Sequence, residues 1–302
     1  MSLLVVGSIG FDTLETPFGK VEEVLGGTAV YCGISASFFS GARLVGVVGE
    51  DFSEKEMAFL RSYRLDLDGV EIKPGKSFRW GATYGVDLNS RETLFTDLNV
   101  FASFNPRIPE KYHDSTYVFL GNIGPELQLS VLEQIKQPRL VALDTMNYWI
   151  ERTPNELRKV LQRVDVLLVN DSEAKSLADH QNLVNATKLI RKMGPKIIII
   201  KKGEHGALLS TGENFFCAPA FPLETVCDPT GAGDTFAGGF MGYLAKADKL
   251  DETAFRQAAI CGSTMASFAC ERFGPERFQS LDDSQIRARV NAFHEMTKFV
   301  PW

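Results

Sequence analysis

The sequence lacks any block of clustered basic residues, and acidic residues outnumber basic ones. There are 38 Asp and Glu against 32 Lys and Arg, which gives a formal net charge of −6. This balance argues against nucleic acid or an anionic membrane surface as a partner. The apolar run nearest the N-terminus, Leu3 to Val6, is too short for a signal peptide, and no run approaches the roughly 20 residues of a membrane helix.

Cysteine and histidine are too few and too scattered to form a metal site or a disulfide framework. The five cysteines are odd in number and include no C-x-x-C pair, so we expect free thiols in a reducing cytoplasm. The four histidines have no metal-ligand spacing. Cys227 lies inside the glycine-rich stretch described below and is expected to be a small buried residue.

Two common nucleotide-binding motifs are also absent. The chain has no G-x-x-x-x-G-K-[ST] loop, and the segment GSIGFD after the first apolar run does not have the G-x-G-x-x-G spacing. A Walker-type NTPase and a nicotinamide dehydrogenase are therefore both disfavoured.

The chain does contain short apolar runs that alternate with helical patterns. Such continuous runs are typical of buried parallel strands with helices on both faces, so we expect an α/β fold with a three-layer, doubly wound, mostly parallel sheet. A helical pattern over 53–65 and mostly helix from Gly233 onward complete this pattern. The expected strands are 3–6, 43–49, 116–121, 139–144, 164–169, 196–203 and 224–226.

Two segments depart from this alternation of apolar strands and helices, because polar and apolar residues alternate within them. They are FDTLETPFGKVEEV (11–24), with a Pro-Phe-Gly turn, and FRWGATYGVDLNSRETLFTD (78–97), with an Asn-Ser-Arg turn. Period-2 alternation predicts half-exposed antiparallel strands, which we expect to pair as a small sheet inserted in a single domain spanning 1–302. This small sheet is either a lid over a cleft or a decorative hairpin pair.

Polar or glycine-rich residues follow several of the expected strands. In doubly wound sheets, ligands bind beyond the carboxyl ends of the strands. The residues at these positions are Asp12, Asp144, Asn170, Glu173, Gly203, Gly206 and the stretch CDPTGAGDTFAGGF at 227–240.

The glycine-rich stretch 227–240 combines an anion-binding pattern with carboxylates. Backbone N–H groups of Gly231, Ala232 and Gly233 at a helix start can bind a phosphate. Asp234 follows at once and can take the proton from an attacking hydroxyl. The stretch therefore predicts phosphoryl transfer to an alcohol.

DPTGAGDTFAGGF resembles the second signature of the ribokinase-like, or PfkB, carbohydrate kinase family, D-[TP]-[TS]-G-A-G-D-x-F. The resemblance extends over nearly the whole chain. The other segments that carry it are Gly26-Gly27, GARLVGVVGEDF (41–52), NDSE (170–173) and KKGEHGALL (201–209).

This resemblance implies a role for each matching position on the phosphate side. Asp234 is expected to be the general base, and Gly231, Ala232 and Gly233 the anion hole for the γ-phosphoryl group of ATP. Further residues are expected to organise Mg²⁺, largely through water, and to border the ATP site. They are Asn170 and Glu173 for the ion, and Lys201, Gly203 and Gly206 for the nucleotide, with Asp144 and Asn147 as a weaker match near the phosphates.

On the acceptor side, Asp12, Gly26 and Gly27 are expected to hold hydroxyl groups of the substrate. Asp228 and Thr230 match positions that help to bind a monovalent cation such as K⁺ in many members. One position departs from the family, because Tyr31 stands where an Asn usually touches the acceptor. Tyr31 either stacks on a ring of the substrate or simply packs.

The aromatic and basic residues of segment 78–97 do not decide which acceptor the protein binds. Arg79 and Arg91 either pair with a phosphate on the acceptor or are solvated charges. Trp80 and Tyr84 either contact a base or pack within the small sheet. We expect an ATP-dependent kinase for a sugar or nucleoside, with a phosphorylated sugar or a small vitamin-like alcohol as the alternative acceptor. A non-catalytic sensor on the same fold is a further alternative, and a homodimer through the lid is permitted.

Overall fold

A computed structural model of the chain describes residues 2–88 and 90–300, and its centre is a large sheet. In the described residues this sheet has nine strands in the order β13-β12-β11-β10-β9-β8-β1-β4-β5. Neighbours from β11 to β5 run parallel, whereas β12 and β13 add antiparallel pairs at one edge. The bounds are β1 (Leu3–Val6), β4 (Ala42–Gly49), β5 (Leu65–Lys73), β8 (Tyr117–Leu120), β9 (Leu140–Asp144), β10 (Val166–Asn170), β11 (Ile197–Lys201), β12 (Ala207–Thr211) and β13 (Asn214–Ala218).

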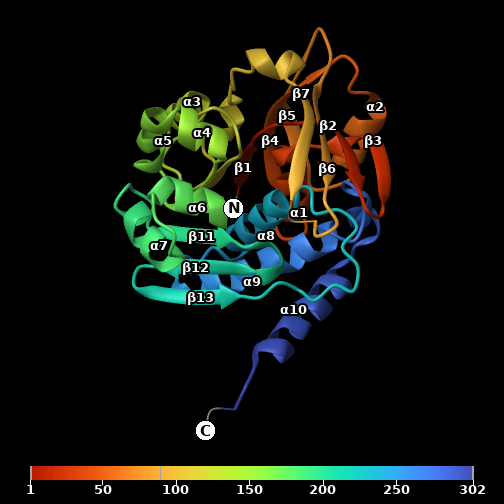
Figure 1. Ribbon diagram of the computed structural model, residues 1–302. Helices are drawn as coiled ribbons and strands as arrows, with labels where there is room; N and C mark the ends of the chain where they lie inside the picture. The colour runs from red at the N-terminus through yellow and green to blue at the C-terminus, as the bar shows by residue number, and fades with distance from the viewer. Residues whose placement is uncertain (1, 89, 301–302) are drawn as a thin grey trace.

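Helices cover both faces of this sheet and make two separate cores. Leu3 and Val5 of β1 face one core, and Leu4 and Val6 face the other, which explains why the strand is apolar at every position. The first core also contains residues of α1 (Thr28–Ser37), α2 (Glu54–Arg61), α8 (Ala232–Ala247), α9 (Glu252–Ala269) and α10 (Asp283–Thr297). The second contains residues of α3 (Pro125–Gln134), α4 (Asn147–Arg152), α5 (Pro154–Leu161), α6 (Asp171–Ala178) and α7 (Leu183–Arg191). The predicted three-layer α/β/α fold is confirmed, and Figure 1 shows the C-terminal helix α10 extending away from the body.

The strand order reverses at β1, which lies between β4 and β8. The chain proceeds from β1 to β4 and β5 on one side, and from β8 to β9, β10 and β11 on the other. Helices that connect these two halves lie on opposite faces, and in doubly wound sheets ligands bind beyond the carboxyl ends of the strands at such a reversal. The segments after these strands therefore surround the expected ligand position.

A second sheet has four strands in the order β3-β2-β6-β7. Its strands are β2 (Gly10–Thr16), β3 (Gly19–Gly26), β6 (Phe78–Tyr84) and β7 (Arg91–Asp97), and we call them the small sheet. The two alternating segments do pair as one small sheet (Figure 1). Strands within each segment are antiparallel as predicted, whereas β2 and β6, which join the two segments, run parallel. Asn89 of the predicted Asn-Ser-Arg turn lies outside the described residues.

Two predicted elements differ from the structure. The helix expected over 53–65 ends at Arg61, and β5 begins at Leu65, because LDLDGVEIK alternates and pairs with β4. The strand expected at 224–226 does not form. Cys227 N donates instead to Cys270 O at 2.8 Å, and Cys227 O accepts from Thr16 Oγ1 at 3.0 Å, so helix α9 and the small sheet hold this segment.

Two observations bear on the composition argument. All five cysteines are free thiols in the structure. Within residues 2–88 and 90–300, no helix combines the length and the apolar composition that crossing a membrane requires.

Candidate active site

The glycine-rich stretch 227–240 forms the loop and first turns of α8. Gly231 is the N-cap residue, with φ of 71°, a left-handed conformation that favours glycine. A Cβ at Gly231 would lie 2.5 Å from ring atoms of Tyr31. Backbone conformation and the close approach of Tyr31 therefore both require glycine at this position.

The start of α8 forms a cradle suited to an anion. No side chain caps this helix, and Ala232 N donates to Pro229 O at 3.2 Å. In the described part of the chain, the N–H groups of Gly233 and Asp234 have no partner, so they are available to a ligand. A Cβ at Gly233 would lie 3.0 Å from Lys201 Nζ, so the cradle is closed on one side by an ammonium group. These features fit a phosphoryl group.

Lys201 ends β11 and pairs with Asp144 at the end of β9. Lys201 Nζ lies 3.3 Å from Asp144 Oδ2, and both side chains are largely buried. Burial alone would lower the pKa of Lys201, but the surrounding carboxylates, that of Asp144 above all, raise it above its ordinary value. Lys201 is therefore a fixed positive charge at the cradle.

Asp234 lies in the first turn of α8, and its buried side chain hydrogen-bonds to Thr28 at the start of α1. Its pKa is raised above the ordinary value, first by burial and then by the charge of Asp144, while Lys201 opposes the shift. A carboxylate with a raised pKa is a better proton acceptor for an alcohol, so the position suits a general base.

Asn170 and Glu173 form a reciprocal cap at the start of α6. Asn170 Oδ1 accepts from Glu173 N, and Glu173 Oε2 accepts from Asn170 N, each at 2.8 Å. The pKa of Glu173 is raised by burial and by the charge of Asp144, against Lys201. Among the described residues no three His, Cys, Asp or Glu side chains are grouped to hold a metal directly. Carboxylates near the cradle do fit an ion that keeps its water shell, as Mg²⁺ prefers.

The other predicted nucleotide-side residues lie at two strand ends. Gly203 begins a one-turn helix η3 (Gly203–His205) after β11, and Gly206 follows it before β12. A Cβ at Gly206 would lie 2.1 Å from Ala218 O at the end of β13, and φ of 77° also favours glycine there. Asn147 begins α4 and is exposed.

On the acceptor side, Asp12 of β2 is 4% exposed and lies against Gly26. A Cβ at Gly26 would lie 2.1 Å from Asp12 Oδ2, and Gly27 next to it has φ of 99°. In the described residues the carboxyl group of Asp12 has no hydrogen-bond partner. Burial, and then the charges of Asp228 and Asp234, raise the pKa of Asp12 to about 8.

Tyr31 of α1 lies under the same site and is 1% exposed. Its hydroxyl is buried with no hydrogen-bond partner in the described residues. The ring contacts Gly231, so Tyr31 supports the cradle from the acceptor side. Packing thus accounts for the ring, whereas the unpaired hydroxyl leaves a polar group for a ligand.

Asp228 and Thr230 are held by the loop that precedes α8. Asp228 accepts from Thr230 N at 2.8 Å and from Gly274 N at 3.3 Å. Thr230 Oγ1 in turn lies 2.9 Å from the hydroxyl of Tyr84, a contact between the loop and the small sheet. The sequence reading missed this contact, because nothing in the spacing of Tyr84 and Thr230 signals it.

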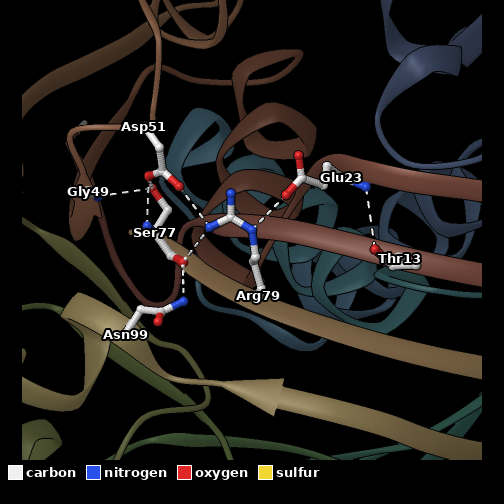
Figure 2. Close-up of polar contacts among 7 residues, drawn as sticks. All are labelled: Thr13, Glu23, Gly49, Asp51, Ser77, Arg79 and Asn99. Carbon is white, nitrogen blue, oxygen red and sulfur yellow. Dashed lines mark hydrogen bonds and ion pairs between the residues drawn. The ribbon is translucent and has the colours of Figure 1, made fainter. Parts of the chain in front are cut away.

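Arg79 of β6 is surrounded by acceptors of its own chain, as Figure 2 shows. Its Nε donates to Glu23 Oε1 at 2.8 Å, and Nη1 contacts Asp51 Oδ2 at 2.7 Å and Ser77 O at 3.1 Å. Asp51 follows β4, and Ser77 N and Oγ both donate to it at 2.7 Å. Arg79 therefore ties the small sheet to the central sheet, a role that sequence reasoning did not predict.

Comparison with known proteins identifies relatives along most of the chain. A family model described as pfkB family carbohydrate kinase matches residues 4–280. A cytidine kinase of Thermococcus kodakarensis is 32% identical over 259 residues, covering 83% of this chain and 91% of that protein. An adenosine kinase of Saccharomyces cerevisiae is 26% identical over 297 residues, covering 87% and 82%.

Solved structures share the fold at lower identity. The nucleoside kinase of Burkholderia thailandensis in complex with ADP-inosine has a TM-score of 0.80 at 20% identity, covering 97% of this chain and 96% of that one. A nucleoside kinase of Methanocaldococcus jannaschii has a TM-score of 0.77 at 18% identity, covering 96% and 98%.

Proposed function

The chain belongs to the pfkB family of carbohydrate kinases, and from this premise we propose that it transfers the γ-phosphoryl group of ATP to a hydroxyl of a nucleoside. The observation that carries the proposal is the start of α8. There Asp234 follows an uncapped, glycine-built cradle whose wall is the Lys201 ammonium group.

The residues of this site divide the reaction between them. Backbone N–H groups of Gly231 and Gly233 and the charge of Lys201 hold the phosphoryl oxygens and oppose the charge that develops on them. Ala232 N, expected as a third donor of this anion hole, already donates to Pro229 O. Asp234 orients the acceptor hydroxyl and takes its proton as the new oxygen–phosphorus bond forms. Mg²⁺, held through water near Asp144 and Glu173, would neutralise charge on the phosphates.

On the acceptor side, Asp12, Gly26 and Gly27 bind the hydroxyl groups of the sugar. Asp12 is suited to this role because its buried carboxyl has no partner in the described residues. A diol of the acceptor that hydrogen-bonds to this carboxyl group supplies the partners that it lacks. Tyr31 offers its unpaired hydroxyl at the same place.

A nucleoside is favoured over a phosphorylated sugar for two reasons. The cytidine kinase relative aligns over 83% of this chain. In addition, Arg79 is already engaged by Glu23 and Asp51, so its charge is not available to a phosphate on the acceptor. Trp80 on the same strand supplies an aromatic surface for a base.

Further parts of this proposal concern the whole molecule. The chain acts as one domain, and the small sheet is its lid, excluding water during transfer. Asp228 and Thr230 shape a site for a monovalent cation such as K⁺ near the anion hole. A homodimer through the lid and a cytoplasmic location stay predictions from the sequence.

The test is a screen for ADP release with the purified chain, ATP and Mg²⁺. Acceptors should include cytidine, uridine, adenosine, inosine, ribose and fructose 6-phosphate, each with and without K⁺. We expect a nucleoside to give the highest kcat/KM, with the phosphorylated product identified by mass spectrometry. A preference for fructose 6-phosphate would contradict the proposed acceptor, and ATP binding without transfer to any acceptor would contradict the activity.

A further inference from the structure

The side chain of Arg79 spans three strands of the small sheet. Arg79 lies opposite Phe11 in the pair of β6 and β2, and its guanidinium carbon lies 5.3 Å from the centroid of the Phe11 ring. Its Nε reaches Glu23 on β3, the strand beyond β2, and its Nη1 reaches Asp51 after β4 of the central sheet (Figure 2). We call Glu23, Arg79 and Asp51 the Arg79 bridge.

The Asp51 end of the bridge is held at the segment that leads into β6. Oδ1 of Asp51 accepts hydrogen bonds from N and Oγ of Ser77, the residue before this strand. Ser77 Oγ in turn accepts from Gly49 N, and Ser77 O accepts from Asn99 Nδ2, shortly after β7. Burial alone would raise the pKa of Asp51, but hydrogen bonds from Ser77 and Arg79 lower it, so Asp51 is a charged partner.

The Glu23 end of the bridge depends on an irregularity in β3. The register of β3 against β2 shifts just after Asp12, and Glu23 lies in this bulge. Glu23 has φ of 51°, a left-handed conformation that is uncommon for a residue other than glycine. Bulges redirect side chains and are frequent beside active sites. This bulge presents Glu23 to Arg79 at 2.8 Å.

Asp12 follows Phe11 directly, on the acceptor side of the site. Successive residues of a strand project to opposite faces, so Asp12 and the bridge lie on opposite faces of β2. The ring of Phe11 packs against the guanidinium group of the bridge and against the ring of Phe52, whose centroid is 5.6 Å away. Arg91, the second arginine of the small sheet, lies elsewhere, with its guanidinium carbon 5.1 Å from the Trp80 ring centroid. The bridge therefore fixes β2 at the residue next to Asp12.

We propose that Arg79 is a positioning residue that sets the affinity for the acceptor, because its bridge fixes β2, and the Asp12 that β2 carries, against the central sheet. This inference rests on the proposed kinase function, in which Asp12 binds hydroxyl groups of the acceptor. Hydrogen bonds weaken steeply when their geometry is lost, so a small displacement of β2 weakens acceptor binding. Glu23 is 61% exposed, so water screens its ion pair and the bridge adds only modestly to stability.

The test uses full-length Arg79→Met, with Arg43→Met as the matched control. Arg43 makes the same kinds of contact, an ion pair with Asp114 at 2.8 Å and a ring contact with Tyr112 at 5.2 Å, but it joins β4 to the segment before β8. We expect Arg79→Met to raise the KM for the best nucleoside acceptor at least about tenfold, with kcat and the KM for ATP changed less than about threefold. Arg43→Met should change all three less than about threefold, with a similar fall in melting temperature.

Two further variants separate positioning from a general structural role. Arg79→Lys should give an intermediate acceptor KM, because an ammonium group lacks the planar fork that reaches Glu23 and Asp51 together. Asp51→Asn still accepts a hydrogen bond from Ser77 N but loses the ion pair, so its acceptor KM should also rise. The double variant Asp51→Asn/Arg79→Met should have the acceptor KM of Arg79→Met, since both changes break one bridge. Effects that multiply in the double variant would overturn the inference.

Wild-type turnover in the same assay separates this inference from the proposed function. If the wild type is active and Arg79→Met keeps the acceptor KM within about threefold, the bridge does not position the acceptor site. Equal rises in the KM for ATP and for the acceptor, or the same acceptor KM in Arg43→Met and Arg79→Met, would also overturn the inference. If Arg79→Met does not fold, Arg79→Lys and Asp51→Asn decide by the same comparison. A wild type that transfers nothing to any acceptor contradicts the proposed function and this inference together.

Discussion

Lys201 Nζ lies 3.3 Å from Asp144 Oδ2, joining the ends of two strands that flank β10. The pair sits beside two further carboxylates, those of Glu173 and Asp234, which interact with it electrostatically. One ammonium group among three carboxylates leaves the site short of positive charge. Binding a triphosphate there requires added cations or protons, which agrees with a Mg²⁺-dependent reaction and with the raised pKa values of Glu173 and Asp234.

Replacing Lys201 should change both the rate and its pH dependence. Lys201→Met should lower kcat/KM for ATP about tenfold or more, because the charge that closes the anion cradle is lost. Lys201 lowers the pKa of Asp234, so its removal raises that pKa and moves the rising limb of the pH–rate profile to higher pH. The neighbouring Lys202→Met is the control. An unshifted profile in Lys201→Met would exclude this electrostatic coupling.

The cradle itself can be tested by adding one methyl group. Gly233→Ala places a Cβ 3.0 Å from Lys201 Nζ, in the space assigned to phosphoryl oxygens. Because alanine fits a helix well, the melting temperature should not fall, while kcat should drop at least about tenfold. Steady-state kinetics and thermal denaturation measure the two effects. Normal kcat in a stable Gly233→Ala would show that the phosphoryl group binds elsewhere.

Glu173→Gln separates the cap of α6 from the magnesium role. Glutamine still accepts a hydrogen bond from Asn170 N, so the cap and the melting temperature should be kept. Loss of the carboxylate should raise the Mg²⁺ concentration for half-maximal rate about tenfold. Glu173→Ala, which also removes the hydrogen bond from Asn170 N, should lose stability too. If Mg²⁺ titrations of Glu173→Gln and wild type coincide, Glu173 only caps the helix.

Asp12 should make stability depend on pH. Its folded-state pKa of about 8 lies above the ordinary 3.8, so the folded chain holds a proton that the unfolded chain releases. Stability from this group therefore falls as the pH rises from about 4 to about 8. Asp12→Asn, which cannot ionise, should gain more in melting temperature over the wild type at pH 8 than at pH 5, while losing acceptor affinity. Equal gains at both pH values would argue against a buried, protonated Asp12.

The layers, the parallel strands and the small sheet could be predicted from the sequence. A continuous apolar run indicates a strand that is buried on both faces, and an alternating run indicates a strand that is buried on one face. The prediction failed at 224–226, where an apolar pattern does not reveal that Cys270 and Thr16 hold the backbone. The motif at 227–240 placed Asp234 and the cradle in one turn because they are neighbours in the chain.

Contacts between segments that are distant in the chain could not be predicted from the sequence. The Arg79 cluster joins β3, β6 and the segment after β4, and the Tyr84–Thr230 contact spans 146 positions. Each depends on the packing of the small sheet against the central one, which no local pattern records. The roles of the individual site residues stay predictions that the variants above test.

The most direct measurement of the central claim is the single-turnover rate of Asp234→Asn with its best nucleoside acceptor, alongside ATP binding. The account predicts a loss of roughly 10²–10⁴-fold in rate, the usual worth of a positioned base, with ATP affinity close to that of the wild type. A rate for Asp234→Asn within a few-fold of the wild type would contradict the assignment of Asp234 as the base.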